Sequence, residues 1–135
     1  MAANPAFASI PRNGLGQVSV ANALRDGSGT VVTIFTAGVN GSRVDKVTCK
    51  AAQTTTAGMV RLFVHDGANF RLAYELLVTA VTASATVASF TGTVPTVEQG
   101  FANDIFPLIL PSGYSLRACT QVGEQINILA QGGDF

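Results

Sequence analysis

The residue types that most often carry catalysis are sparse in this chain. Its single histidine, His65, is followed by Asp66. A nucleophilic triad would need a serine or cysteine oriented by that histidine, and an acid holding the imidazole. His65 ends a segment of alternating residues that predicts a strand, and adjacent side chains on a strand point to opposite faces. His65 and Asp66 are therefore badly placed to pair, and Asp66 is better explained as a turn residue.

The sequence also lacks the residue patterns of metal sites, phosphate-binding loops and paired catalytic carboxylates. One histidine and two distant cysteines do not give the ligand spacing of a zinc site, and no run of oxygen ligands indicates a calcium loop. The glycine-rich segment 26–29 lacks the Lys-Ser/Thr ending of a phosphate-binding loop. The eight acidic residues are dispersed, so no pair of carboxylates for glycoside hydrolysis stands out. The sequence predicts no catalytic residue, no metal site and no cofactor, and therefore no enzyme.

The two cysteines, Cys49 and Cys119, are too few for a disulfide framework. Each lies in a predicted strand, where a free cysteine behaves as a small buried hydrophobic residue. We predict two buried thiols, and a single bridge between them is the alternative that the sequence leaves open.

Three arginines lie in predicted strands, opposite apolar rows. A solvated polar face would explain them, and so would an interface, because the planar guanidinium pairs well with the carboxylates of a partner. Apolar residues close to the two ends of the chain are the other candidates for anchoring on a neighbour. The candidate partner contacts are Phe7, Ile10, Arg61, Arg71, Arg117 and Phe135.

The composition argues against nucleic acid and membrane surfaces as partners. Eight basic residues balance eight acidic ones, which leaves no basic footprint for phosphates or anionic lipids. Only 12% of the residues are charged and the net charge is +0, a combination that promotes self-association. We therefore expect a homo-oligomer or a protein whose surface is covered by partners. The uncharged segment 76–97 contains Gly92 and Pro95 and alternates with period two, so it does not predict a membrane span.

The segment 58–78 predicts the hairpin around which the fold is built. Val60, Leu62 and Val64 alternate with polar or outward positions in the first arm. The second arm is expected to bury one row of five residues, Phe70, Leu72, Tyr74, Leu76 and Val78. The link between the arms, Asp-Gly-Ala-Asn, suits a tight turn. A hairpin alone is marginal in water, so other strands must cover it.

The rest of the chain predicts further short strands and one arm. Residues 1–17 contain Pro5, Pro11, Gly14 and Gly16 and are expected to form an extended N-terminal arm, followed by an edge strand over 18–25. Residues 132–135 are expected to be a flexible end. The strands expected in between cover 30–37, 42–53, 84–94, 105–110, 114–121 and 125–131.

About eight or nine strands at this spacing predict a single all-β domain over residues 18–135, an antiparallel β-sandwich. A jelly roll is the favoured version, because it takes eight strands in a chain of this length. An immunoglobulin-like sandwich is disfavoured, since the chain has no tryptophan.

Two segments of the chain carry a resemblance. TTTAGMVRLFVHDGANFRLAYEL (54–76), and LPSGYSLRACTQ (110–121) with NILAQGGDF (127–135), resemble a family of small structural proteins of tailed bacteriophages and prophages. The resemblance covers roughly residues 9–135, and its motifs are structural. It implies a virion component made in the cytoplasm of the bacterial host. The version it favours is a decoration or cement protein on the head surface that binds the major capsid protein or another virion protein.

A different kind of binding protein remains the alternative. A receptor-binding or carbohydrate-binding β-sandwich at a tail tip or head fibre would use exposed aromatic residues in its loops. Phe70, Tyr114 and Phe101 are the residues that could serve in that way.

Overall fold

The computed structural model describes residues 8–94 and 107–135, and in these ranges the chain forms nine β-strands and no helix. The strands are β1 (Ile10–Val18), β2 (Val32–Thr36), β3 (Ser42–Ala51), β4 (Gly58–His65), β5 (Phe70–Val78), β6 (Thr91–Val94), β7 (Leu108–Leu110), β8 (Ser115–Thr120) and β9 (Ile126–Asp134).

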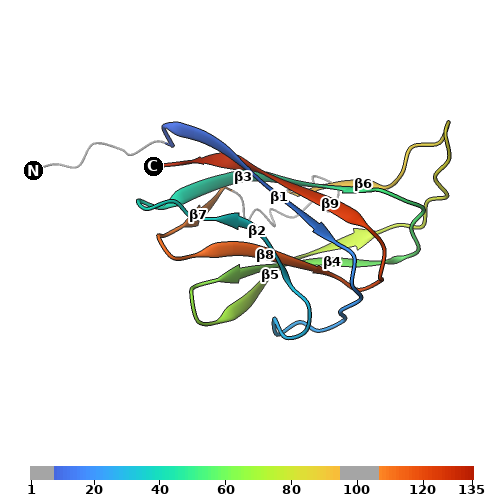
Figure 1. The fold of residues 1–135 in the computed structure, drawn as a ribbon, viewed down its shortest axis with the longest axis horizontal. Helices are drawn as coiled ribbons and strands as arrows, with labels where there is room; N and C mark the ends of the chain where they lie inside the picture. Colours follow the sequence, from blue (N-terminus) through green and yellow to red (C-terminus); the bar gives the residue numbers. More distant parts are fainter. Residues whose placement is uncertain (1–7, 95–106) are drawn as a thin grey trace, which may run out of the picture.

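These strands form two antiparallel sheets that pack face to face (Figure 1). The first sheet has the order β1-β9-β3-β6, and β7 also pairs with β3. The second sheet has the order β2-β8-β4-β5. The predicted all-β antiparallel sandwich is thereby confirmed.

The core lies between the sheets and follows the expected alternation. On β9, Ile126, Ile128 and Ala130 are buried while the residues between them turn outward. The predicted Leu62 lies inward on β4 with no exposed surface, whereas Leu77 on β5 is 58% exposed. Alternate burial of this kind is what ties each strand to its register.

Two glycines of β1 close one side of the sandwich. A Cβ atom at Gly14 would lie 2.2 Å from the carbonyl oxygen of Ile34, and one at Gly16 would lie 2.4 Å from the Ile34 Cδ1 atom. Only glycine lets β1 of the first sheet approach β2 of the second this closely. The prediction of an arm over residues 1–17 is therefore wrong for Ile10 onward, because β1 pairs with β9 along its whole length. The predicted edge strand over 18–25 is also wrong, since β1 ends at Val18.

A register shift divides β5 into two parts. Leu62 pairs with Tyr74, but the next residue, Phe63, pairs with Leu72, so Ala73 is the extra residue of a β-bulge. An extra residue reverses the faces beyond it. Tyr74, Leu76 and Val78 therefore face the core as predicted, whereas Phe70 and Leu72 share the outer face with Phe63.

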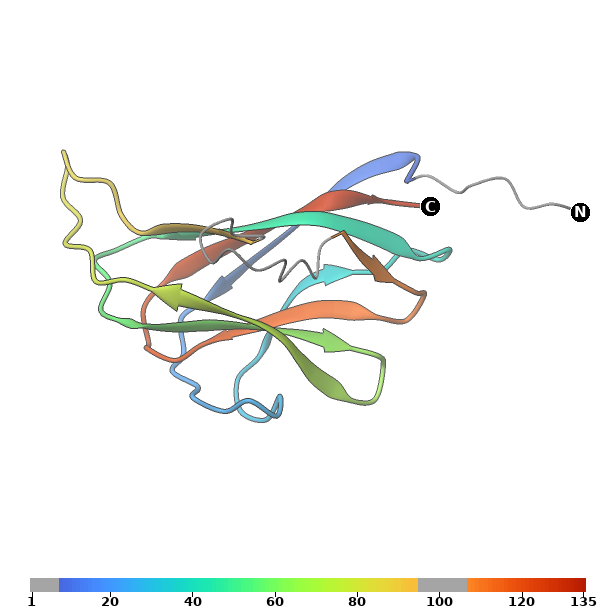
Figure 2. The ribbon, with the colours of Figure 1, turned by 180° about the vertical axis from the view of Figure 1, so that it is seen from behind.

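The edge of the first sheet beside β3 is formed by two short strands. β6 pairs with 47–50 and β7 with 42–44, so they follow one another along β3. The predicted strand over 84–94 is reduced to its last four residues. The segment before it, 79–90, projects from one end of the sandwich (Figure 2).

The C-terminal residues are part of the first sheet. β9 continues to Asp134, whose carboxylate accepts hydrogen bonds from the Arg12 Nε atom and from the Ser42 hydroxyl. The Arg12 guanidinium also lies 4.1 Å from the centre of the Phe35 ring. The Ser42 hydrogen bond is the main cause that lowers the pKa of Asp134, and Arg12 adds to it. The prediction of a flexible end over 132–135 is wrong.

Candidate contact surfaces

The outer face of the first sheet carries no covering segment among the described residues, and we call it the open face. Its central row crosses the sheet through Leu15, Leu129, Thr48 and Thr93, which are register partners on β1, β9, β3 and β6. Leu15 is 72% exposed. The leucine side chains and threonine methyl groups of this row make the middle of the open face apolar.

Polar rows flank the central row on both sides. One row contains Gln17, Asn127, Lys50 and Thr91, and the other contains Asn13, Gln131 and Lys46. The Gln17 amide donates to the Asn127 side-chain oxygen at 2.8 Å, which links these two side chains across β1 and β9. An apolar centre with a polar rim is the usual anatomy of a protein–protein contact.

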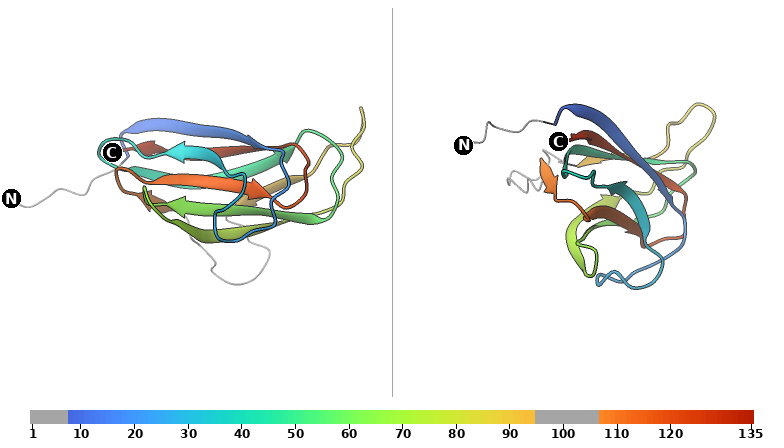
Figure 3. Two further views of the ribbon diagram at one scale, coloured as in Figure 1. Left: turned by 60° about the horizontal axis from the view of Figure 1, so that its bottom comes forward. Right: turned by 60° about the vertical axis from the view of Figure 1, so that its left-hand side comes forward.

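The outer face of the second sheet has the opposite character, and we call it the covered face. Residues 19–31 join β1 to β2 and pass over it, as the left view of Figure 3 shows. The Asn22 side chain holds this cover loop together, because it donates to the carbonyls of Ser28 and Thr30 and accepts from the amide of Leu24. The glycine-rich segment 26–29 lies within this loop, and its two glycines have positive φ angles.

The cover loop contacts the sheet through close backbone approaches. Gly27 has a φ of +85° and lies against the Phe70 ring, where a Cβ atom would be 2.2 Å from the Phe70 Cγ atom. Phe70 in turn packs edge-on against Phe63, with 6.1 Å between ring centres. Phe63 is fully buried, although its side chain points away from the core between the sheets. The covered face therefore holds a small second core.

A buried arginine lies on the covered face. Arg61 is only 3% exposed, and its Nε atom lies 3.7 Å from the Glu75 Oε2 atom. Within the described part of the chain, the Nε and Nη1 atoms of Arg61 have no hydrogen-bond acceptor. Glu75 instead accepts two hydrogen bonds from Arg25 of the cover loop, at 2.9 and 3.2 Å. The hydrogen bond from Arg25 is the main cause that lowers the pKa of Glu75.

The two cysteines are free thiols, and both are buried as predicted. Cys49 lies in the core, where burial raises its pKa to about 12. Cys119 lies on the covered face, and its Sγ atom donates to the Asn22 carbonyl at 3.7 Å. Burial raises the pKa of Cys119 as well, and the charge of Arg61 partly opposes that shift. Burial thus disfavours the reactive thiolate form at both cysteines.

His65 and Asp66 have structural partners in the β4–β5 turn. The His65 Nδ1 atom accepts from the amide of Gly67 at 3.2 Å, and the Asp66 carboxylate accepts from the amides of Ala68 and Asn69 at 2.9 and 2.7 Å. The two amide hydrogen bonds lower the pKa of Asp66. These contacts match the turn role expected of Asp66.

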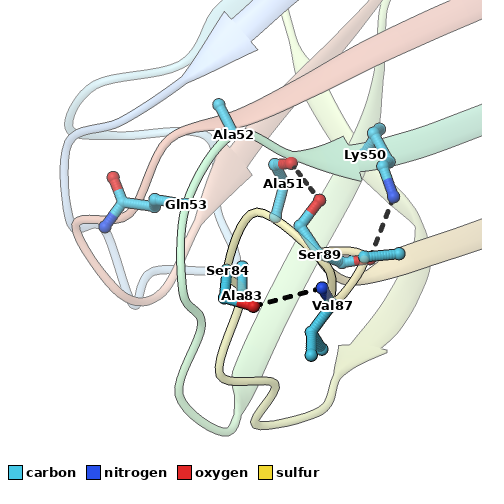
Figure 4. A pocket seen from close by; sticks show the side chains of 9 residues that line it. Lys50, Ala51, Ala52, Gln53, Ala83, Ser84, Val87 and Ser89 are labelled. Atoms are coloured by element: carbon cyan, nitrogen blue, oxygen red, sulfur yellow. Dashed lines mark hydrogen bonds between the residues drawn. The ribbon is translucent and has the colours of Figure 1, made fainter.

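A shallow depression of about 440 Å³ lies beside Lys50 and the loop that precedes β6 (Figure 4). The Lys50 ammonium donates to the Ser89 carbonyl and the Thr91 hydroxyl, both at 2.9 Å, and the Ser89 hydroxyl donates to the Ala51 carbonyl. Of the described residues that line the depression, only Lys50 is charged, and its ammonium contacts neutral oxygens. The depression itself is open to solvent. The depression offers no acid–base pair for catalysis.

The predicted contact arginines do not form one patch. Arg61 is buried, so a solvated-face interpretation is wrong for it. Arg117 is half-buried on the same outer face, where its Nε atom donates to the Ser115 hydroxyl at 2.9 Å. Arg71 pairs with Val64 in the register and therefore belongs to the opposite face, at an exposed position near the turn.

The apolar contact candidates lie apart from these arginines. Ile10 begins β1 and is 58% exposed. Phe135 is half-buried, and its amide donates to the Gly41 carbonyl at 3.1 Å. Phe7 lies outside the described residues.

Sequence reasoning did not identify the open face as a contact surface, and Leu15, Leu129 and Lys46 are not among the predicted partner contacts. The alternation of 126–131 indicated that Leu129 turns outward, which was a usable signal. Residues 10–18 lack the alternation of apolar and polar residues that predicts a strand, so the position of Leu15 beside Leu129 could not be inferred.

No protein-family profile matches this chain, and no curated protein matches it. Among the described residues, no group of three or more His, Cys, Asp or Glu side chains could hold a metal ion. A helix long and apolar enough to cross a membrane is likewise absent from the part of the chain that the structure describes.

Proposed function

We propose that this protein is a non-enzymatic virion component that decorates an assembled bacteriophage head and stabilises it. Its partner in this proposal is the major capsid protein or another protein of the shell. The resemblance of the segments 54–76, 110–121 and 127–135 supports the proposal. These segments form β4, β8, β9 and most of β5, so the resemblance concerns the scaffold that holds both outer faces.

The open face is the observation that carries the proposal. A sheet face with an apolar central row and polar flanks has the layout of a protein–protein contact surface. The leucine pair at Leu15 and Leu129 would be the centre of that contact. Decoration of this kind stabilises the shell by mass action, about 2.7 kcal/mol per site at a hundredfold excess over Kd, because the ligand binds only the assembled form.

The jelly-roll form of the sandwich is part of the proposal. β1 pairs with β9, β2 with β8, β3 with β6, and β4 with β5. If β6 and β7 are two halves of one edge strand, these are the nested pairs of an eight-stranded, two-sheet roll.

The carbohydrate-binding alternative has less support. Phe70 packs beneath the cover loop, and Tyr114 packs against the core. Both aromatic rings are therefore occupied in the structure, while Phe101 lies outside the described residues. Binding of the protein to an oligosaccharide array would favour this alternative.

The test is attachment to capsids that have been stripped of their own copy of the protein. Leu15→Asp should weaken binding and abolish the gain in heat resistance of the shell, because it places a charge in the centre of the contact. Leu77→Asp is the matched control, since Leu77 is an exposed leucine on the second sheet. Equal binding by both variants would remove the open face from the mechanism, and no binding by the wild type would overturn the decoration function.

A further inference from the structure

The charges of the open face indicate what kind of partner it fits. The chain has two lysines, Lys46 and Lys50, and both lie on β3. They are register partners of Gln131 and Asn127, which turn outward from β9, so both lysines project from the open face. Both are exposed, and they lie on opposite sides of the row that contains Thr48.

The described residues leave these two cations without a carboxylate. Asp45 is the acidic residue of this part of β3, and its carboxylate is held by the Arg43 Nε atom at 2.6 Å. The Lys50 ammonium contacts only neutral oxygens. Lys46 makes no side-chain hydrogen bond or ion pair with the described residues. On β3, the open face therefore presents three cations, Arg43, Lys46 and Lys50, and one carboxylate, that of Asp45.

We propose that the partner surface of the open face is acidic, with carboxylates that meet Lys46 and Lys50 on either side of the Leu15–Leu129 contact. This inference rests on the proposed function. An ammonium that loses water in a contact needs a carboxylate to compensate, and an uncharged partner would leave it unpaired. Charges at the rim mainly raise the association rate and make binding depend on salt.

The two lysines make a direct chemical test available. Zero-length carbodiimide coupling joins an amine to a carboxylate only when they are in contact. Apart from the α-amino group, the amines of this chain are Lys46 and Lys50. Coupling on stripped capsids saturated with the protein should yield peptides that join these lysines to Asp or Glu of the shell protein. Attachment without any such peptide would overturn the inference.

A charge-reversal pair gives an independent readout. Lys46→Glu should bind stripped capsids about tenfold more weakly than the wild type at low salt, and added salt should reduce this difference in affinity. Arg71→Glu makes the same change in net charge at an exposed position near the β4–β5 turn, which lies outside the open face and therefore outside the contact proposed here, and it should bind like the wild type.

The outcomes separate the two proposals. If the wild type binds and Lys46→Glu binds equally well, the acidic partner is wrong while decoration stands. If the wild type itself does not bind, both proposals fall.

Discussion

The two outer faces of the sandwich differ in what lies over them, although each belongs to an antiparallel sheet with the same alternation. On the open face, no described segment covers Leu15, and the neighbouring rows consist of Asn, Gln, Lys and Thr. On the covered face, Phe63 and Cys119 are buried although both point away from the core between the sheets. Cys119 contacts Asn22 of the cover loop, and Phe63 packs against Phe70, on which the loop lies. The loop turns an outer row into a second buried layer.

That difference explains how an arginine comes to be buried. Arg61 occupies a position in the outer row, where a charged residue normally reaches water. The cover loop removes the water, and Arg25 on the same loop takes both oxygens of the nearest carboxylate, Glu75. The loop thus covers apolar surface where Gly27 packs on the Phe70 ring of β5, but it leaves the desolvated Arg61 guanidinium incompletely paired.

The largest expected difference between the faces is the cost of removing an apolar side chain. Phe63→Ala should lower the free energy of unfolding by about 3–5 kcal/mol, as in an ordinary core, because Phe63 is fully buried. Leu15→Ala on the open face should change it by no more than about 0.5 kcal/mol. Chemical denaturation of both variants measures this comparison, and equal costs would mean that the cover loop does not form a second core.

The next effect concerns the cover loop itself. Gly27→Ala should cost about 2–3 kcal/mol, because the left-handed φ is unfavourable for alanine and the new methyl group would overlap the Phe70 ring. Gly67→Ala is the matched control, since Gly67 has a φ of +99° but its Cβ atom would meet only a carbonyl oxygen at 3.7 Å. The difference between the two variants isolates the contact with Phe70.

Thiol labelling reports whether the loop lifts in Gly27→Ala. Cys119 lies beneath the loop and should react faster with a thiol reagent in this variant, while Cys49 in the core should react as slowly as in the wild type. Unchanged labelling of Cys119 would show that the loop stays in place.

Much of the second sheet could be predicted from local sequence. The β4–β5 hairpin, its Asp-Gly turn and the burial of Cys119 follow from alternation and turn chemistry over a few residues. The bulge at Ala73 could not be predicted in this way. Because the outer face is covered too, Phe70 and Leu72 are apolar in either register, and the pattern does not reveal which face they occupy.

The first sheet shows where local reasoning fails. Residues 10–18 contain proline and glycine and lack alternation, yet β9, more than a hundred residues later, pairs with every one of them. Gly14 and Gly16 serve a close approach between β1 and β2 that no local pattern records. Glycine at positions 27 and 29 is typical of a turn, but the packing of this segment on Phe70 depends on tertiary contacts. For the same reason, neither outer face could be recognised as open or covered from the sequence.

A smaller effect is expected at the ion pair that ties the cover loop to β5. Glu75→Gln should cost about 1 kcal/mol at neutral pH, because two charge-assisted hydrogen bonds from Arg25 are weakened. The pKa of Glu75 is lowered from its usual 4.5 in the folded protein, so ionised Glu75 stabilises the fold at pH values above that range.

This contribution disappears as the pH falls from about 4.5 through the folded-state pKa of Glu75. The stability difference between wild type and Glu75→Gln should therefore be constant near neutral pH and shrink in acid. Urea unfolding of both proteins at a series of pH values measures it. A difference that stays the same at low pH would show that the carboxylate charge is not what stabilises the loop.

The smallest effect is expected where the covered face looks most unusual. Arg61→Met should leave stability within about 1 kcal/mol of the wild type, or raise it. Methionine keeps the unbranched apolar stem that packs under the loop, and it removes two buried donors that have no acceptor. Glu75 keeps both of its hydrogen bonds to Arg25, so no carboxylate is left unpaired. Arg61→Ala is the contrasting variant, because it also removes the stem and leaves a cavity, and it should be clearly less stable than Arg61→Met. If urea denaturation gave the two variants the same large loss, the Arg61 guanidinium itself would be stabilising the covered face, and the cost assigned to its unpaired donors would be wrong.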